Sequence, residues 1–60
     1  MIVKLKNFTE NALLLNQQET EGIIIDKSGR WISLMQGEDI IDIELERLRE
    51  FIKALKQIAE

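Results

Sequence analysis

The sequence has no cysteine, histidine, proline or tyrosine, and these absences limit what the chain can do. Without cysteine no disulfide can form, and without histidine as well a zinc site of the usual kind is excluded. The thiol nucleophile and the imidazole base, on which many enzymes depend, are missing for the same reason. We therefore expect a protein that is not an enzyme and that holds no cofactor or metal.

Length and charge narrow the class of protein further. The chain has 60 residues, a net charge of −3 and 45% hydrophobic residues. This length predicts one domain, residues 1–60, near the lower limit at which a hydrophobic core alone gives a stable fold. The negative charge disfavours a protein built mainly to bind phosphates.

Long apolar runs are also missing. No run approaches the ~20 residues that span a bilayer, and the first residues, Met1-Ile2-Val3-Lys4, lack the pattern of a signal peptide. We expect a complete cytoplasmic polypeptide with no membrane contact, from a very short gene of the kind found in phages and mobile elements.

Apolar residues occupy neighbouring positions in three consecutive segments, residues 23–25, 31–35 and 40–43. In a strand, neighbouring side chains point to opposite faces, so these segments predict a sheet that is apolar on both sides. Residues 1–6 and 12–15 favour two further short strands. The pattern indicates an α+β fold built on an antiparallel β-meander of four or five strands.

The first predicted hairpin turns at Lys27-Ser28-Gly29. These residues suit a three-residue loop with a bulge, in which glycine takes a positive φ. That loop places Ile25 opposite Trp31 and Ile24 opposite Ile32.

The second predicted hairpin turns at Gly37-Glu38, which suits a type II′ turn with glycine first. A four-residue loop over residues 36–39 would give the same pairs, namely Met35 with Ile40 and Leu34 with Ile41. Directly opposed residues share a face of the sheet, so the two turns together predict an aliphatic face and a mixed face. The aliphatic face would hold Ile24, Ile32, Leu34, Ile41 and Ile43. The mixed face would hold Ile23, Ile25, Trp31, Ser33, Met35, Ile40 and Asp42.

From about residue 44 to 59 the apolar period becomes helical. The apolar positions recur at alternating spacings of three and four: Leu45, Leu48, Ile52, Leu55 and Ala59. Asp42 is the expected N-cap of this amphipathic helix. Because it is the only helix, we expect it to pack on the aliphatic face.

The mixed face then has no covering element, and it predicts self-association. Its large apolar side chains are Ile23, Ile25, Trp31, Met35 and Ile40. Together they exceed the apolar patch that a monomer usually exposes. The sequence therefore predicts a homodimer, and a binding or regulatory role such as an inhibitor or adaptor. A larger protein is an alternative partner for the same face.

A second hypothesis is a platform for single-stranded nucleic acid. If Val3 and Leu5 face the core, Lys4 and Lys6 lie on the side of Trp31, where lysines would follow phosphates while the indole stacks on a base. The strands, the C-terminal helix and the segment 29–34 (GRWISL) resemble the dimeric single-stranded-DNA-binding transcriptional coactivators. The resemblance implies such binding, but it covers only that segment, and the chain departs from it by an extra strand and an acidic balance.

Acidic residues gather between residues 38 and 46. Glu38, Asp39 and Glu46 form a candidate docking edge for a basic partner surface. A divalent-cation site is a further interpretation, but the segment lacks the calcium-loop pattern. Turn, strand-end and helix-start positions favour acidic residues without any ligand.

Overall fold

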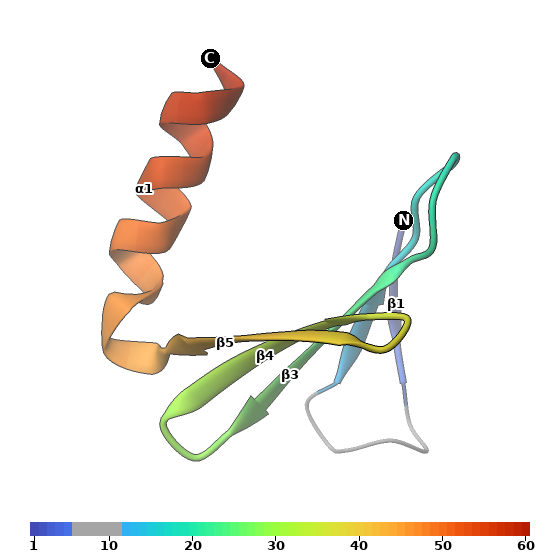
Figure 1. The fold of residues 1–60 in the computed structure, drawn as a ribbon, viewed down its shortest axis with the longest axis horizontal. Coiled ribbons are helices and arrows are strands. Elements are labelled where there is room, and N and C mark those ends of the chain that lie inside the picture. Colours follow the sequence, from blue (N-terminus) through green and yellow to red (C-terminus); the bar gives the residue numbers. More distant parts are fainter. Residues whose placement is uncertain (6–11) are drawn as a thin grey trace.

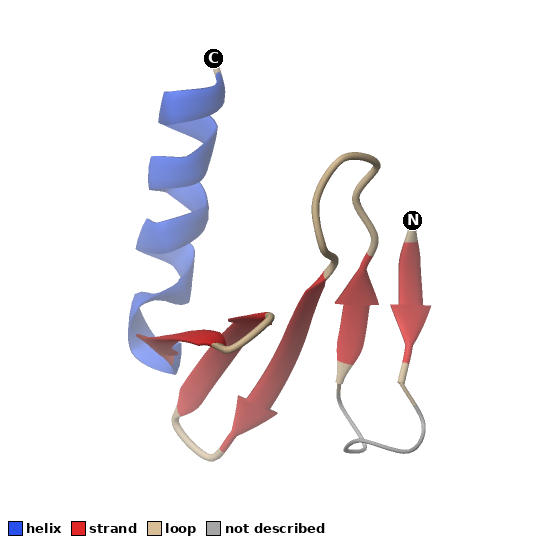
Figure 2. Cartoon of the chain, turned by 45° about the vertical axis from the view of Figure 1, so that its right-hand side comes forward, coloured by secondary structure: helices blue, strands red, loops and turns tan. Residues whose placement is uncertain are grey.

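The computed structural model describes residues 1–5 and 12–60 and shows an α+β fold (Figure 1). The strands are β1 (Ile2–Lys4), β2 (Leu13–Leu15), β3 (Ile23–Ser28), β4 (Trp31–Gln36) and β5 (Asp39–Glu44). A 3₁₀ helix, η1 (Leu45–Arg47), leads into the helix α1 (Leu48–Ala59). All five strands form one antiparallel sheet in sequence order (Figure 2). The predicted meander with one C-terminal helix is confirmed.

The β4–β5 hairpin has the predicted register. Its pairs include Met35 with Ile40, Leu34 with Ile41, Ser33 with Asp42 and Ile32 with Ile43. Gln36 pairs with Asp39, so Gly37 and Glu38 form a two-residue loop. Gly37 has a φ of 58°, and in the described part of the chain no residue other than glycine has a positive φ. This is the type II′ turn, which needs a positive φ at its first central residue only.

The predicted register of the β3–β4 hairpin is wrong by three residues. Ile25 pairs with Leu34 and not with Trp31, which instead pairs with Ser28. The loop is therefore the two residues Gly29 and Arg30, and Gly29 has a φ of 57°. Glycine at positive φ suits both a bulged three-residue loop and a type II′ turn, so the residue type alone did not distinguish them. The shorter loop lets the strands pair up to Ser28, which lengthens the ladder.

An odd shift in register moves every side chain of β3 to the other face of the sheet. Ile23 and Ile25 therefore belong to the aliphatic face, and Ile24 belongs to the mixed face. The aliphatic face crosses all five strands and contains Ile2, Leu13, Leu15, Ile23, Ile25, Ile32, Leu34, Ile41 and Ile43, with Lys4, Lys27, Gln36 and Asp39 at or near strand ends. The mixed face contains Val3, Leu14, Ile24, Asp26, Ser28, Trp31, Ser33, Met35, Ile40, Asp42 and Glu44.

The helix leaves the sheet at the end of β5 and extends away from it (Figures 1 and 2). The expected packing of this helix across the aliphatic face of its own sheet is not what the structure shows. Only η1 separates β5 from α1, and the Leu45 N–H donates to the Arg30 carbonyl at 2.7 Å. This bond ties the start of η1 to the β3–β4 turn, and no loop remains to bring the helix back over the sheet.

The expected N-cap is also different. Asp42 lies inside β5, where its carboxylate accepts a hydrogen bond from Ser33, and Glu44 precedes η1 in an extended conformation without a side-chain cap. The described ion pair joins Arg47, the last residue of η1, to Glu50 of α1 at 2.9 Å, and both side chains are exposed. In the described residues, no helix has the length and apolar character needed to cross a membrane.

The chain has very little interior. Among the described residues, Ala12 is the one buried apolar side chain, and no polar side chain is buried. The radius of gyration is 12.1 Å, whereas a compact domain of this length has about 10.4 Å. The molecule is open because the helix and the sheet do not cover one another.

The first prediction concerns the β3–β4 turn. Gly29→Ala should lower the free energy of unfolding by about 1–2 kcal/mol, because an L side chain is strained at positive φ even though nothing lies within 4 Å of the added methyl group. Urea unfolding at a fixed protein concentration measures this change. Ser28→Ala, one residue earlier in the paired strand, is the control and should cost about 0.5 kcal/mol or less. Equal losses for the two variants would contradict the positive φ of Gly29.

Candidate functional site

The aliphatic face is the largest apolar surface of the sheet. At its centre Ile25, Ile32 and Leu34 are half-buried among their neighbours, while Ile41 on the edge strand is 60% exposed. A hollow of about 470 Å³ opens at one end of β4 and β5, lined by Ile23, Leu34, Met35, Gln36, Asp39, Ile40 and Ile41. The face therefore offers an apolar depression with a carboxylate in its lining.

The helix carries a second uncovered apolar surface, the apolar stripe of Leu48, Phe51, Ile52, Leu55, Ile58 and Ala59. Leu48 and Phe51 at the base of the helix are half-buried. Beyond them Ile52 is 43% exposed, Leu55 is 53% exposed and Ile58 is 88% exposed. An isolated amphipathic helix of this length is marginal in water, so its stability depends on burying this stripe.

A basic stripe borders the apolar stripe of the helix. Arg49, Lys53 and Lys56 follow one another at spacings of four and three, which places them along one side of α1. The β4–β5 turn and β5 carry the opposite charge in Glu38, Asp39, Asp42 and Glu44, with no basic residue among them. The chain thus separates its charges between the helix and the edge of the sheet.

The mixed face is apolar at one end and acidic at the other. Val3, Leu14, Ile24, Met35 and Ile40 are neighbours across the ladder, and polar residues follow toward the β3–β4 turn. There the Ser33 hydroxyl donates to the Asp42 carboxylate at 2.8 Å. Asp26 lies opposite Ser33 on the neighbouring strand β3. Two carboxylates beside one hydroxyl disfavour a serine alkoxide, so this group is a poor nucleophile.

The self-association residues predicted from sequence are divided between the two faces. Trp31, Met35 and Ile40 lie on the mixed face as expected, but Ile23 and Ile25 lie on the aliphatic face because of the register of β3. The sequence pattern also left out Ile2, Leu13 and Leu15, which extend the aliphatic face onto β1 and β2. Leu13 and Leu15 lie opposite Ile25 and Ile23. The sequence would therefore assign them to the aliphatic face only if the shorter β3–β4 loop were chosen.

The residues of the nucleic-acid hypothesis are likewise separated. Lys4 lies on the aliphatic face, opposite to the face of Trp31, and Lys6 lies outside the described residues. Trp31 is 50% exposed, and it lines a hollow of about 160 Å³ with Arg30, Glu44 and Glu46. The two carboxylates outnumber the one guanidinium in this hollow, so this end of the sheet does not favour stacking on a nucleic acid.

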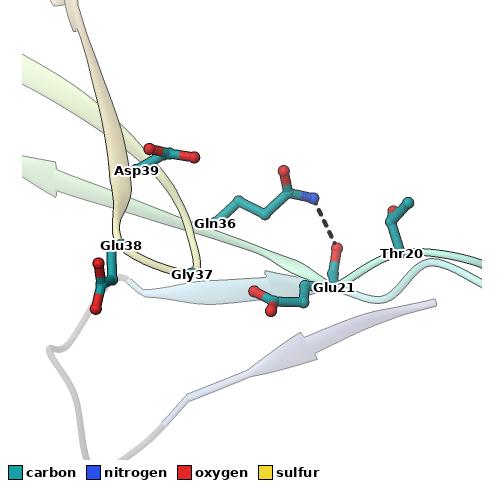
Figure 3. A pocket seen from close by; sticks show the side chains of 6 residues that line it. All are labelled: Thr20, Glu21, Gln36, Gly37, Glu38 and Asp39. Atoms are coloured by element: carbon teal, nitrogen blue, oxygen red, sulfur yellow. Dashed lines mark hydrogen bonds between the residues drawn. The ribbon is translucent and has the colours of Figure 1, made fainter.

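Two acidic residues of the predicted docking edge, Glu38 and Asp39, line a hollow of about 540 Å³ at the β4–β5 turn. Figure 3 shows its lining residues, Thr20, Glu21, Gln36, Gly37, Glu38 and Asp39. The Gln36 side-chain amide donates to the Glu21 carbonyl at 2.9 Å, and Gln17 donates to the same carbonyl at 3.0 Å. A Cβ on Gly37 would lie 3.0 Å from a Glu21 carboxylate oxygen. These contacts hold the end of the β2–β3 loop against the β4–β5 turn.

The described carboxylates at this turn do not form a metal site. The side chains of Glu21, Glu38 and Asp39 point in different directions (Figure 3), and the described residues contain no group of three or more acidic side chains able to hold a metal ion. Glu46 belongs to η1, beyond the other end of β5, at least roughly 17 Å along the strand from Asp39. The three residues of the docking edge are therefore not brought together.

Comparison with known proteins gives no match to a family model, to a curated protein or to a solved structure. The resemblance of residues 29–34 to the single-stranded-DNA-binding coactivators therefore rests on those residues alone. What remains to indicate a function is the geometry of the uncovered surfaces.

The second prediction tests the surroundings of Trp31. Titration with oligo-dT at low salt should leave Trp31 fluorescence unchanged, because Glu44 and Glu46 outnumber Arg30 in the same hollow and repel phosphates. Low salt is the sharpest condition, since electrostatic attraction to nucleic acid is strongest there. Saturable quenching that disappears as salt is added would show that a basic surface reaches the indole after all.

Proposed function

We propose that this protein is a non-catalytic binding or regulatory protein that assembles as a homodimer and acts through protein–protein contacts, as an inhibitor or adaptor does. The observation that carries this proposal is the excess of exposed surface. The chain exposes 5491 Å², whereas a folded monomer of 7.0 kDa exposes about 4,000 Å². The difference, about 1,500 Å² per chain, is larger than one side of a standard interface and is typical of obligate dimers.

The aliphatic face is the surface that supports assembly best. It is continuous over five strands, and in it aliphatic side chains dominate. A chain of this size with so little interior gains its stability by burying such a face against another chain. The sheet carries apolar residues on both faces, and this still supports self-association. The proposed contact is through the aliphatic face and not through the mixed face that carries Trp31.

Pairing of two sheets edge to edge is less favourable. β5 is the longer edge strand of the sheet, and it carries Asp39, Asp42 and Glu44. A second β5 beside it would bring like charges together, and charged residues of this kind are a common protection of strand edges. Assembly through a face avoids this repulsion.

A dimer formed through the aliphatic face leaves the mixed face open. That face combines the exposed apolar residues Trp31 and Ile40 with the carboxylates of Asp26, Asp42 and Glu44. Aromatic and aliphatic anchors beside acidic groups suit a partner protein with apolar and basic residues on its surface. The same carboxylates disfavour nucleic acid as the ligand.

The third prediction compares two neighbouring residues that have matching exposure and lie on opposite faces. Ile41 on the aliphatic face is 60% exposed, and Ile40 on the mixed face is 62% exposed. Ile41→Glu should convert the dimer to a monomer, because it places a charge in the aliphatic face, whereas Ile40→Glu should leave the dimer intact. The two variants add the same charge to the same strand and differ in the face that carries it. Sedimentation equilibrium at micromolar concentration measures the mass, and circular dichroism verifies the fold.

The outcome can contradict the proposal in two ways. A wild-type mass near 7.0 kDa at high concentration would exclude the homodimer altogether. Loss of the dimer in Ile40→Glu alone would place the interface on the mixed face, where the sequence had predicted it.

A further inference from the structure

The apolar stripe of α1 and the aliphatic face match in size. The helix has 12 residues, which makes it about 18 Å long. Strands β3, β4 and β5 have six residues each, a length of about 20 Å, and three strands span roughly 14 Å across. One helix therefore covers the central part of this face, as helices do in two-layer α+β folds.

The two surfaces also allow one charge contact, at Asp39. The basic stripe of Arg49, Lys53 and Lys56 runs beside the apolar stripe, and α1 contains one acidic residue, Glu50. The aliphatic face ends at the acidic edge of β5, where Asp39 lines the apolar hollow of about 470 Å³. A helix placed on the face with its basic stripe toward the start of β5 brings a cation to Asp39, the acidic residue of β5 on this face, while its leucine and isoleucine side chains enter the hollow.

The helix of the same chain does not reach this position. Its start is tied to the β3–β4 turn through the bond from Leu45 to Arg30, and the chain passes from β5 to α1 through η1 alone. In this arrangement Leu55 and Ile58 stay exposed. An equivalent helix from a second copy has no such tether.

We propose that α1 of each protomer docks on the aliphatic face of its partner, so that two copies exchange their C-terminal helices. This inference rests on the proposed homodimer and specifies how it is built. Each helix and each sheet face is used once, which gives a closed two-fold assembly. Two identical contacts per dimer would cover the helix stripe and the sheet face of each chain, which contribute to the excess of about 1,500 Å².

A complementation experiment on the full-length chain tests the exchange. Ile41→Glu damages the sheet face, and Leu55→Lys damages the helix; each variant alone should remain near 7.0 kDa, because every helix-on-sheet contact then contains one damaged side. In an equal mixture, one contact joins an intact helix to an intact face, and the other joins the new lysine to the new glutamate. The mixture should therefore regain a mass near twice 7.0 kDa, and native mass spectrometry should show one copy of each variant per dimer.

Matched controls change the opposite surfaces. Ile40→Glu lies on the other face of the sheet, and Gln57→Lys lies on the polar side of α1, about half a turn from Leu55. Each control variant should dimerise alone. If Ile41→Glu or Leu55→Lys unfolds on its own, recovery of a folded dimer on mixing still supports the exchange.

The other outcomes separate the two proposals. A dimer of Ile41→Glu alone would indicate packing of helix against helix, and a dimer of Leu55→Lys alone would indicate packing of sheet against sheet; either overturns the exchange and keeps the homodimer. A mixture that stays monomeric while the wild type dimerises also overturns the exchange. A wild type that is monomeric at high concentration overturns both.

Discussion

The direct passage from β5 into the C-terminal helix is the constraint on which the rest of the structure depends. The hydrogen bond from the Leu45 N–H to the Arg30 carbonyl, at 2.7 Å, holds the start of η1 against the β3–β4 turn, and no loop follows before α1 begins. A short connection of this kind sets the direction of the helix. Because the helix points away from its own sheet, the helix and the aliphatic face both keep apolar surface exposed.

Two glycine turns decide which residues share that face. Gly29 and Gly37 each take a positive φ at the start of a two-residue loop. Loops of equal length keep β3, β4 and β5 in step, so that Ile25, Leu34 and Ile41 lie side by side on one face. The apolar surplus is thereby collected mainly on one side of the sheet, while the other side keeps Trp31 beside carboxylates.

The charged residues are divided between the helix and the edge of the sheet. The basic residues of α1 line one side of the helix, and the acidic residues of β5 line the edge of the sheet. Contacts between exposed charges add little stability, but they discriminate between orientations and between partners. In the proposed homodimer the apolar surfaces supply the driving force for assembly, and Asp39 favours the orientation that brings a cation of α1 to it.

The amino-acid sequence by itself determined the elements, because alternating and helical apolar periods are local properties. It also determined the β4–β5 register, since both loops that suit Gly37 give the same pairs. It did not determine the β3–β4 register, because Gly29 suits two loops that differ by an odd number of residues and so exchange the faces of Ile23 to Ile25. Only the structure decided that register and the direction of α1, since the register depends on how far the ladder between β3 and β4 extends toward the turn, and the direction depends on the bond from Leu45 to the Arg30 carbonyl.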